Sequence, residues 1–189
     1  KMALFISGTG GNALSLVEAC RAGRVPAEPI LAVASTPKAA GIARLRDAGL
    51  LVLVVEKAGV DDAAYSACLF GLADAAEVEL ICLAGWLKKL VIPAPWEGRI
   101  LNIHPSLLPR HGGAGMYGLH VHRAVLAAGE TESGCTVHQV DNEFDHGAIL
   151  AQARVPVLPE DTAEALQQRV YAQEMELYPA AVREFLERA

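Results

Sequence analysis

The stretch that decides the fold of this 189-residue chain is Met2-Ala-Leu-Phe-Ile-Ser-Gly-Thr-Gly-Gly-Asn12, a short apolar run that breaks into glycines. A helical pattern follows, with apolar residues at positions 14, 16, 17 and 20 and an end near Gly23. Strand, glycine loop and helix in this order open a nucleotide-binding type of α/β unit. The stretch therefore predicts a first strand over residues 2–7 and a helix directly after the glycines.

The glycine loop at residues 8–12 is also a candidate anion site. Its backbone N–H groups can point at an anion, and the start of the following helix adds a favourable dipole. The loop contains neither a complete Gly-x-Gly-x-x-Gly motif nor a Gly-Lys-Ser/Thr ending, so the pattern favours a monophosphate over a dinucleotide. A glycine turn that binds nothing is the competing interpretation.

The rest of the chain alternates between apolar strand patterns and amphipathic helices. Strands are predicted at 30–35, 50–55, 78–84, 100–104, 135–140 and 149–157, and helices at 39–48, 61–76, 119–128 and 162–187, the last as one helix or as a pair broken near Pro179. This alternation predicts one α/β domain over residues 1–189, with a mostly parallel twisted sheet, helices on both faces and an antiparallel C-terminal strand pair. The continuous apolar run at 50–55 predicts a strand covered on both faces.

Composition excludes several classes of protein. The net charge of −6 argues against a nucleic-acid partner, because phosphate binding needs clustered Lys and Arg. The sequence has no run of eighteen apolar residues, so we expect no membrane span. The apolar start is too short for a signal peptide, and the four cysteines lack metal or redox spacing. We therefore expect a cytoplasmic protein with reduced thiols.

Chemistry is predicted at Leu101-Asn-Ile-His-Pro-Ser-Leu-Leu-Pro109, where a strand pattern breaks into prolines. Asn102 and His104 lie two residues apart, so a strand would place both side chains on one face. An amide donor would then stand beside an imidazole that can carry a proton near neutral pH. The competing interpretation is a strand end whose polar side chains only satisfy local backbone groups.

All six histidines fall between residues 104 and 146, which raises the question of a metal site. No His-Glu-x-x-His or similar spacing is present, so the pattern favours structural hydrogen bonding over metal ligation. An acid beside an imidazole would raise its proton affinity and fix its orientation. Spacing alone does not choose between Asp141, Glu143 and Asp145 in the acidic turn at 141–147.

Several separated motifs resemble the folate-dependent formyltransferases. The resemblance rests on Asn-Ile-His-Pro-Ser-Leu-Leu-Pro at 102–109, Gly-Cys-Thr-Val-His at 134–138 and Phe-Asp-His-Gly at 144–147. It extends to residues 6–12, to Leu-Ala-Gly-Trp at 83–86 and to residues 173–179, and so covers nearly the whole chain. The motifs occur in the family's order, which makes the match far more specific than any one of them. The resemblance implies a Rossmann-like formyltransferase fold.

The resemblance also implies a role for each matching residue. Asn102, His104 and Asp145 match the catalytic trio of the family. The residues that match its ribonucleotide-binding positions are Gly10, Gly11, Asn12, Tyr171, Gln173 and Glu174, with Glu174 placed to bind ribose hydroxyls. The folate-binding segments match Leu87, Lys88, Lys89, Leu90, Asn102, Val140, Asp141, Asn142, Glu143 and Phe144.

The implied reaction is transfer of a formyl group from 10-formyltetrahydrofolate, as co-substrate, to the amine of glycinamide ribonucleotide in purine biosynthesis. No metal is implied. The expected partners are these two small molecules, with no nucleic acid and no membrane, and the chain is expected to be a monomer or a homodimer. A sugar-nucleotide N-formyltransferase, another enzyme that uses formyltetrahydrofolate, and a non-catalytic binding protein are the alternatives.

Two segments depart from the family pattern. The loop at 110–118 contains four glycines, at positions 112, 113, 115 and 118, and is longer than in the best-known members. It is either a lid or substrate contact, or a plain length variant. Near Asp62 the family often carries an arginine that contacts the folate tail, and this chain has none there. Lys88 or Lys89 could take over that contact.

Overall fold

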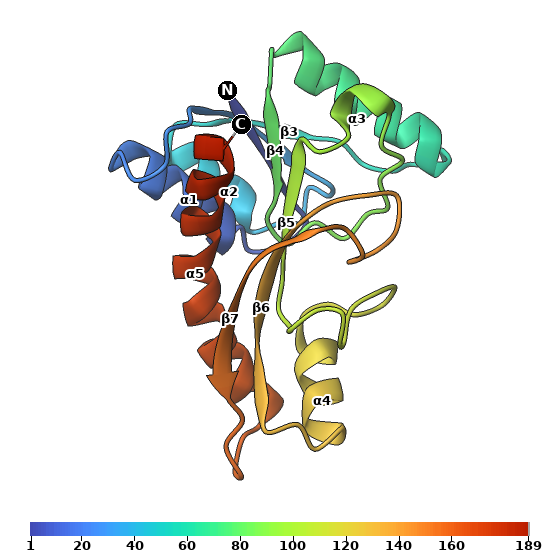
Figure 1. Ribbon diagram of the computed structural model, residues 1–189. Coiled ribbons are helices and arrows are strands. Elements are labelled where there is room, and N and C mark those ends of the chain that lie inside the picture. Colours follow the sequence, from blue (N-terminus) through green and yellow to red (C-terminus); the bar gives the residue numbers. More distant parts are fainter. Residues whose placement is uncertain (189) are drawn as a thin grey trace. The chain divides into compact units, whose positions relative to one another are not determined.

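The computed structural model describes residues 1–188, and the chain forms two compact units, Lys1–Leu101 and the remainder from Asn102 (Figure 1). Whether these units act as the single domain expected from the sequence stays a prediction. Within residues 1–188, no helix combines the length and the apolar character needed to cross a membrane.

The first unit is a parallel α/β arrangement in the strand order β3-β2-β1-β4. The ladders between β1 and β2, β1 and β4, and β2 and β3 are all parallel. Figure 1 shows α1 and α2 on one side of these strands and α3 on the other. The elements are β1 (Met2–Ile6), α1 (Gly11–Arg21), β2 (Pro29–Ala34), α2 (Gly41–Asp47), β3 (Leu51–Val54), α3 (Asp62–Ala75), β4 (Leu80–Leu83) and the short 3-10 helix η1 (Ala94–Trp96).

The core of the first unit is built on β1, whose five residues are all buried. The strand is central in its unit, so both of its faces are covered, as a continuous apolar run predicts. The N-terminus of α3 is capped by Asp61, whose carboxylate accepts a hydrogen bond from the Ala64 amide at 2.7 Å. The predicted start of this helix, at residue 61, is confirmed to within one residue.

The prediction that the third strand is covered on both faces is wrong. β3 is the outer strand of the first unit, and the side chains of Leu51 and Val54 are exposed. The apolar run at 50–55 resembles a central strand because its residues are β-branched and aliphatic. Whether a strand lies at the edge of a sheet depends on which strands pair with it, and the residues of the strand itself do not carry that information.

The second unit contains a two-stranded antiparallel ribbon packed against a long helix. β5 (Ile100–His104) carries the chain into this unit, and β6 lies between β5 and β7. β6 and β7 pair antiparallel, which confirms the predicted C-terminal pair, and α5 packs on both strands and also contacts α4. The elements are α4 (Leu119–Ala127), β6 (Glu132–Gln139), β7 (Ile149–Pro156) and α5 (Ala163–Arg188).

The helix α5 is one continuous element of 26 residues with Pro179 inside it. Proline removes one helical hydrogen bond, which would favour a break in an isolated helix. Here Tyr178 and Val182 beside it are fully buried, so packing of this face outweighs the local cost. The helix start is capped by Thr162, which accepts from the Ala165 amide at 3.1 Å. Of the two structures left open by the sequence, the single helix is correct.

Candidate active site

The candidate active site begins on β5, where Asn102 and His104 occur two residues apart in a strand and so project from the same face. The side chain of His104 is buried and that of Asn102 is partly exposed. The strand ends at His104, and the following chain turns away through Pro105. The predicted strand bounds, 100–104, are confirmed.

Asp145 brings these two side chains together through its carboxylate. Its Oδ2 atom lies 3.4 Å from His104 Nδ1, and its Oδ1 atom lies 3.5 Å from Asn102 Nδ2. Oδ2 also accepts a hydrogen bond from the Gly113 amide at 2.9 Å. The structure thus joins residues that are more than forty positions apart in sequence, as the resemblance implied.

The other two acids of the turn are placed differently. Asp141 Oδ2 lies 2.7 Å from His146 Nδ1 in an exposed pair, and Glu143 is exposed to solvent. Asp145 by contrast keeps only 12% of its side-chain surface accessible. Burial next to two imidazoles separates Asp145 from its neighbours, which the spacing in the sequence could not do.

The environment of Asp145 keeps its carboxylate charged. Burial alone would raise the pKa of this carboxyl, because removal from water disfavours the ionised form. The neighbouring His104 and His138 side chains, the charge of His104 and the Gly113 amide act in the opposite direction and prevail. The pKa of Asp145 is therefore held well below its ordinary value, and Asp145 is an anion throughout the neutral range.

His138 on β6 belongs to the same cluster, and sequence reasoning assigned it only a structural hydrogen bond near the site. Its Nδ1 atom lies 2.8 Å from the Gln139 carbonyl, which can only accept, so Nδ1 carries the hydrogen. In the neutral ring Nε2 is then free to accept from Asn102 Nδ2 at 3.0 Å. This bond fixes which end of the Asn102 amide is the donor.

An irregularity in the strand ladder lies beside His138. Val137 pairs with Ala151 and His138 pairs with Ile149, so the extra residue is Leu150 on β7. Bulges of this kind are frequent next to active sites. The useful sequence signal for His138 was the Gly-Cys-Thr-Val-His motif at 134–138, whereas the bulge has no local signature.

A buried polar network holds the segment after β5 in place. Thr136 on β6 donates to the Ser106 carbonyl at 2.7 Å and accepts from the Leu108 amide at 3.1 Å. Gln152 on β7 donates to Thr136 Oγ1 at 2.9 Å and to the Leu108 carbonyl at 3.0 Å. These bonds tie residues 106–108 to both strands of the ribbon and so give His104 a rigid base.

The glycine loop that follows β1 lies in the first unit, and close packing accounts for part of its composition. Gly10 has a φ of 70°, and a Cβ added there would lie 2.9 Å from the Gly41 Cα atom. Gly41 donates from its amide to the Gly8 carbonyl at 3.0 Å. The starts of α1 and α2 therefore approach each other through glycine backbone. Binding of a phosphate by Gly10, Gly11 and Asn12 remains a prediction.

The two segments expected to bind folate are each turns next to a strand end. Residues 87–90 follow β4, with Leu87 half exposed and Leu90 buried, and the Leu87 amide donates to Ser7 Oγ at 2.9 Å. Residues 140–144 follow β6, and Phe144 is 46% exposed. The first segment belongs to one unit and the second to the other. Their joint role in binding folate remains a prediction.

The candidates on α5 do not share one environment. Glu174 is buried, with 7% of its surface accessible, whereas Tyr171 and Gln173 are exposed. The charge of Glu174 helps to raise the pKa of Cys135 on β6 to about 12, after the larger effect of burial of that thiol. Glu174 thus faces the ribbon β6–β7, and its proposed contact with ribose hydroxyls is untested.

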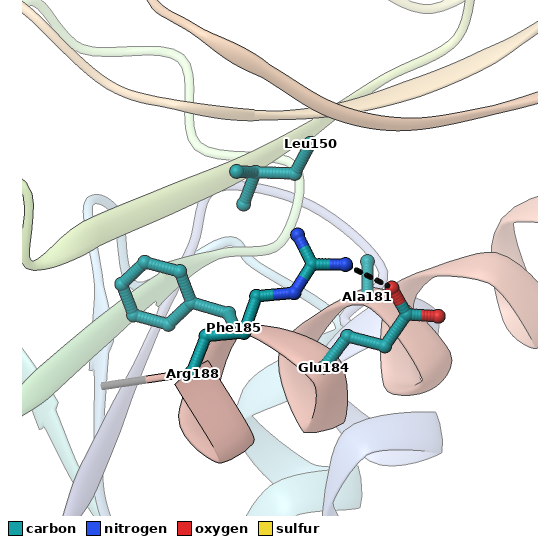
Figure 2. Close-up of a pocket in the computed structure, with 5 residues that line it drawn as sticks. All are labelled: Leu150, Ala181, Glu184, Phe185 and Arg188. Carbon is teal, nitrogen blue, oxygen red and sulfur yellow. Dashed lines mark hydrogen bonds and ion pairs between the residues drawn. The ribbon is translucent and has the colours of Figure 1, made fainter.

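A shallow hollow lies elsewhere in the second unit (Figure 2). Figure 2 shows Arg188 reaching Glu184 along α5, a pair of 3.2 Å, with Leu150 of β7 opposite. None of its lining residues is a candidate site residue, and its polar groups already pair with each other. The cluster around Asp145 is defined by side-chain geometry instead. Among residues 1–188, no three His, Cys, Asp or Glu side chains are grouped as metal ligands would be.

Comparison with known proteins shows which family the chain belongs to. The sequence family described as formyl transferase matches residues 1–182. The chain belongs to that family. The resemblance seen in the motifs and the mostly parallel α/β fold are both confirmed. The catalytic role that the resemblance implies for Asn102, His104 and Asp145, which lie together in the structure, remains a prediction.

Individual relatives agree with the family match. The phosphoribosylglycinamide formyltransferase of Haemophilus influenzae is 37% identical over 99% of this chain and 87% of its own length. The crystal structure of glycinamide ribonucleotide transformylase 1 from Symbiobacterium toebii superposes with a TM-score of 0.91, at 38% identity, over 99% of this chain and 87% of that one. The trifunctional purine biosynthetic protein adenosine-3 of Drosophila melanogaster is 43% identical over 96% of this chain, but the chain spans only 14% of its length.

Proposed function

We propose that this protein transfers the formyl group of 10-formyltetrahydrofolate to the amine of glycinamide ribonucleotide, a step of purine biosynthesis. The observation that carries the proposal is the convergence of Asn102 Nδ2 and His104 Nδ1 on the Asp145 carboxylate, at 3.5 and 3.4 Å. The names of the similar proteins from Haemophilus influenzae and Symbiobacterium toebii support the choice of acceptor.

The chemistry of formyl transfer calls for these residue types. The acceptor amine attacks the formyl carbon and forms a tetrahedral intermediate with a developing oxyanion. Asn102 and protonated His104 are hydrogen-bond donors suited to that oxyanion, and loss of one such donor costs about 100- to 1000-fold in rate. The carbon–N10 bond then breaks, and a proton leaves the amine and reaches N10. Asp145, which stays ionised, stabilises the positive charge on His104.

The binding roles follow from the family resemblance. The ribonucleotide phosphate would bind at residues 10–12, and its ribose would meet Glu174. The folate would bind at residues 87–90 and 140–144, with Lys88 or Lys89 near its glutamate tail. The donor, the cytoplasmic location and the absence of a metal requirement belong to the same proposal. The active protein would be a monomer or a homodimer.

The test is an assay of the purified chain with glycinamide ribonucleotide and 10-formyltetrahydrofolate, with release of tetrahydrofolate as the signal. We expect formylated ribonucleotide and tetrahydrofolate in equal amounts. The matched arm replaces the ribonucleotide with an amino-sugar nucleotide, and turnover only in that arm would replace our proposal with sugar-nucleotide N-formylation. Binding of both compounds without turnover would identify a non-catalytic protein.

A further inference from the structure

The segment at residues 87–90, expected to bind folate, is attached to the first unit at both ends by serine side chains. At one end, the Leu87 amide donates to Ser7 Oγ at 2.9 Å. At the other end, the Val91 amide, one residue past the segment, donates to Ser66 Oγ at 2.8 Å. Ser7 follows β1 and Ser66 lies on α3, so two separate elements hold one short stretch of backbone.

Both serine hydroxyls are held in place by a further hydrogen bond. Ser66 is buried and donates to the Asp62 carbonyl at 2.6 Å, one turn earlier along α3. Its oxygen therefore keeps its lone pairs for the Val91 amide. The buried Ser35, just past the end of β2, donates to Ser7 Oγ at 2.7 Å. The two acceptors are thus oriented by the fold and not by a ligand.

An aromatic cluster holds the chain just before the segment. Trp86 is buried, and its ring centroid lies 5.1 Å from that of Phe5 and 6.2 Å from that of Tyr65, the latter in a stacked orientation. Tyr65 is the neighbour of Ser66 on α3. Gly85 has a φ of 79°, a left-handed conformation that lets the chain turn away from β4. Residue 86 is therefore fixed by packing, and the serine contacts act on the polar backbone that follows it.

The serine contacts determine how the peptide groups at the ends of the segment are oriented. A peptide bond is planar, and in its trans form the N–H and the C=O point in opposite directions. Within the described residues 86–91 no peptide bond is cis. Because the Val91 N–H is directed at Ser66, the Leu90 carbonyl points away from Ser66. The Leu87 contact acts in the same way at the other end. Carbonyl oxygens oriented in this way can accept hydrogen bonds from the N–H groups of a heterocyclic ring.

We propose that Ser7 and Ser66 are positioning residues that hold residues 87–90 in the backbone geometry that receives the folate donor. This inference rests on the proposed function, in which the segment binds folate. Neither hydroxyl touches the donor, and each acts through the amide from which it accepts. Removal of a hydroxyl leaves that amide without its partner and frees one end of the segment. The freed backbone must then be ordered when folate binds, which weakens binding.

Ser66→Ala is the most direct test, because alanine favours the helix and the variant should fold. The measurement is titration calorimetry with tetrahydrofolate, the product form of the donor, under argon and without ribonucleotide. We expect the dissociation constant to rise by about three- to tenfold, as for the loss of one hydrogen bond. Affinity for the ribonucleotide should change by less than about twofold, because α3 carries no residue of its proposed site.

Ser7→Ala frees the other end of the segment, and we expect a rise of the same size in the dissociation constant for tetrahydrofolate. Ser7→Thr keeps the hydroxyl at a partly exposed position, so its affinity should stay within about twofold of wild type. Ser133→Ala on β6 is the matched control. The Ser133 hydroxyl is buried and has no hydrogen-bond partner among the described residues, so its removal should leave the affinity for tetrahydrofolate unchanged.

Wild-type affinity for tetrahydrofolate in both folded alanine variants would reject the positioning role. An equal loss of that affinity in Ser133→Ala, or an equal loss of ribonucleotide affinity in Ser66→Ala, would also reject it, because the effect would then be general. Formyl transfer by the wild type is measured separately. If the variants show the expected affinities for tetrahydrofolate but the wild type transfers no formyl group, the proposed function alone is rejected. A wild type that does not bind tetrahydrofolate would reject both.

Discussion

The glycine turn after β1 in the first unit and the cluster around Asp145 in the second both depend on glycine, for different reasons. In the turn, Gly10 and Gly41 allow two helix starts to approach through their backbones. In the cluster, Gly112 and Gly113 bring a backbone segment onto a charged carboxylate. The first arrangement is explained by packing of the fold, whereas the second orders polar groups that the fold alone does not need.

Two glycine-rich stretches that look alike in the sequence differ in their contacts with charged side chains. A glycine-rich stretch after a first strand suggested an anion site, and a second one after β5 suggested a lid or a length variant. The contacts give the second stretch the stronger link to chemistry, because the Asp145 carboxylate that it contacts is largely covered and ionised. An isolated buried charge would be costly, so its partners on residues 102, 104, 113 and 138 are what make the cluster stable.

The largest expected effect is on turnover in Asp145→Ala. Loss of the carboxylate leaves His104 without its counter-charge, and we expect kcat to fall by about 100- to 1000-fold, as for loss of a main transition-state contact. We expect a loss of kcat in the same range for His104→Ala, and a much smaller change in its affinity for the ribonucleotide. Steady-state kinetics with separate titration calorimetry measures both quantities.

Asp141→Ala provides the comparison within the same turn. This acid pairs with the exposed His146 and not with His104, so we expect kcat to fall by less than about tenfold, as for a surface pair, while KM for the folate, which we propose binds at residues 140–144, can rise. Equal losses in the two alanine variants would show that the turn contributes as a whole and that the cluster does not single out Asp145.

The next expected effect is on stability in acid, and it concerns His122 on α4, which lies outside the cluster around Asp145. Burial of this histidine on α4, with a smaller contribution from the charge of His104, lowers its pKa from 6.5 to about 4. The unfolded chain takes up a proton as the pH falls through 6.5, but the folded chain does so only near 4. The contribution of His122 to the free energy of unfolding is therefore fully present above pH 6.5. It decreases by about 2 to 3 kcal/mol as the pH falls to 4.

His122→Phe should remove that part of the acid sensitivity. The measurement is urea unfolding at a series of pH values from 7 to 4, compared with wild type and with His120→Phe, which adds the same ring at an exposed position of the helix. An unchanged slope of stability against pH in His122→Phe would show that other groups dominate acid unfolding.

The smallest effect tests the glycine contact of the first unit. In Gly41→Ala the new Cβ would lie 2.7 Å from Ile6 Cδ1 and 2.9 Å from Gly10 Cα, so the two helix starts must separate. We expect a loss of about 1 to 3 kcal/mol in the free energy of unfolding, as for overpacked sites. Denaturant titration measures it.

Gly71→Ala is the matched control for that change. Position 71 lies inside α3, and a Cβ there meets open space. Alanine is the better helix former, so stability should rise by about 0.5 to 1 kcal/mol. A stabilised Gly41→Ala would mean that the contact between the helix starts is loose, and would weaken the packing explanation of the glycine turn.

Much of this molecule could be predicted from local pattern. The bounds of β5, the cap of α3 at Asp61 and the antiparallel pair β6–β7 all follow from apolar periodicity and from residues with clear end preferences. Local pattern did not predict the exposed edge at β3 or the unbroken course of α5 through Pro179. Both depend on which element packs beside the segment, and that information lies in distant parts of the chain.

The candidate site divides in the same way. By itself the sequence determined the strand that presents Asn102 and His104, the membership of the formyl transferase family and the residues that match its motifs. Only the tertiary structure separated the largely covered Asp145 from the more exposed Asp141, brought His138 of β6 to Asn102 and brought the His111 carbonyl to His104. The reason is physical: side-chain types and periodicity are local properties, whereas burial, counter-charge and the partner of each ring nitrogen arise only when separated segments meet.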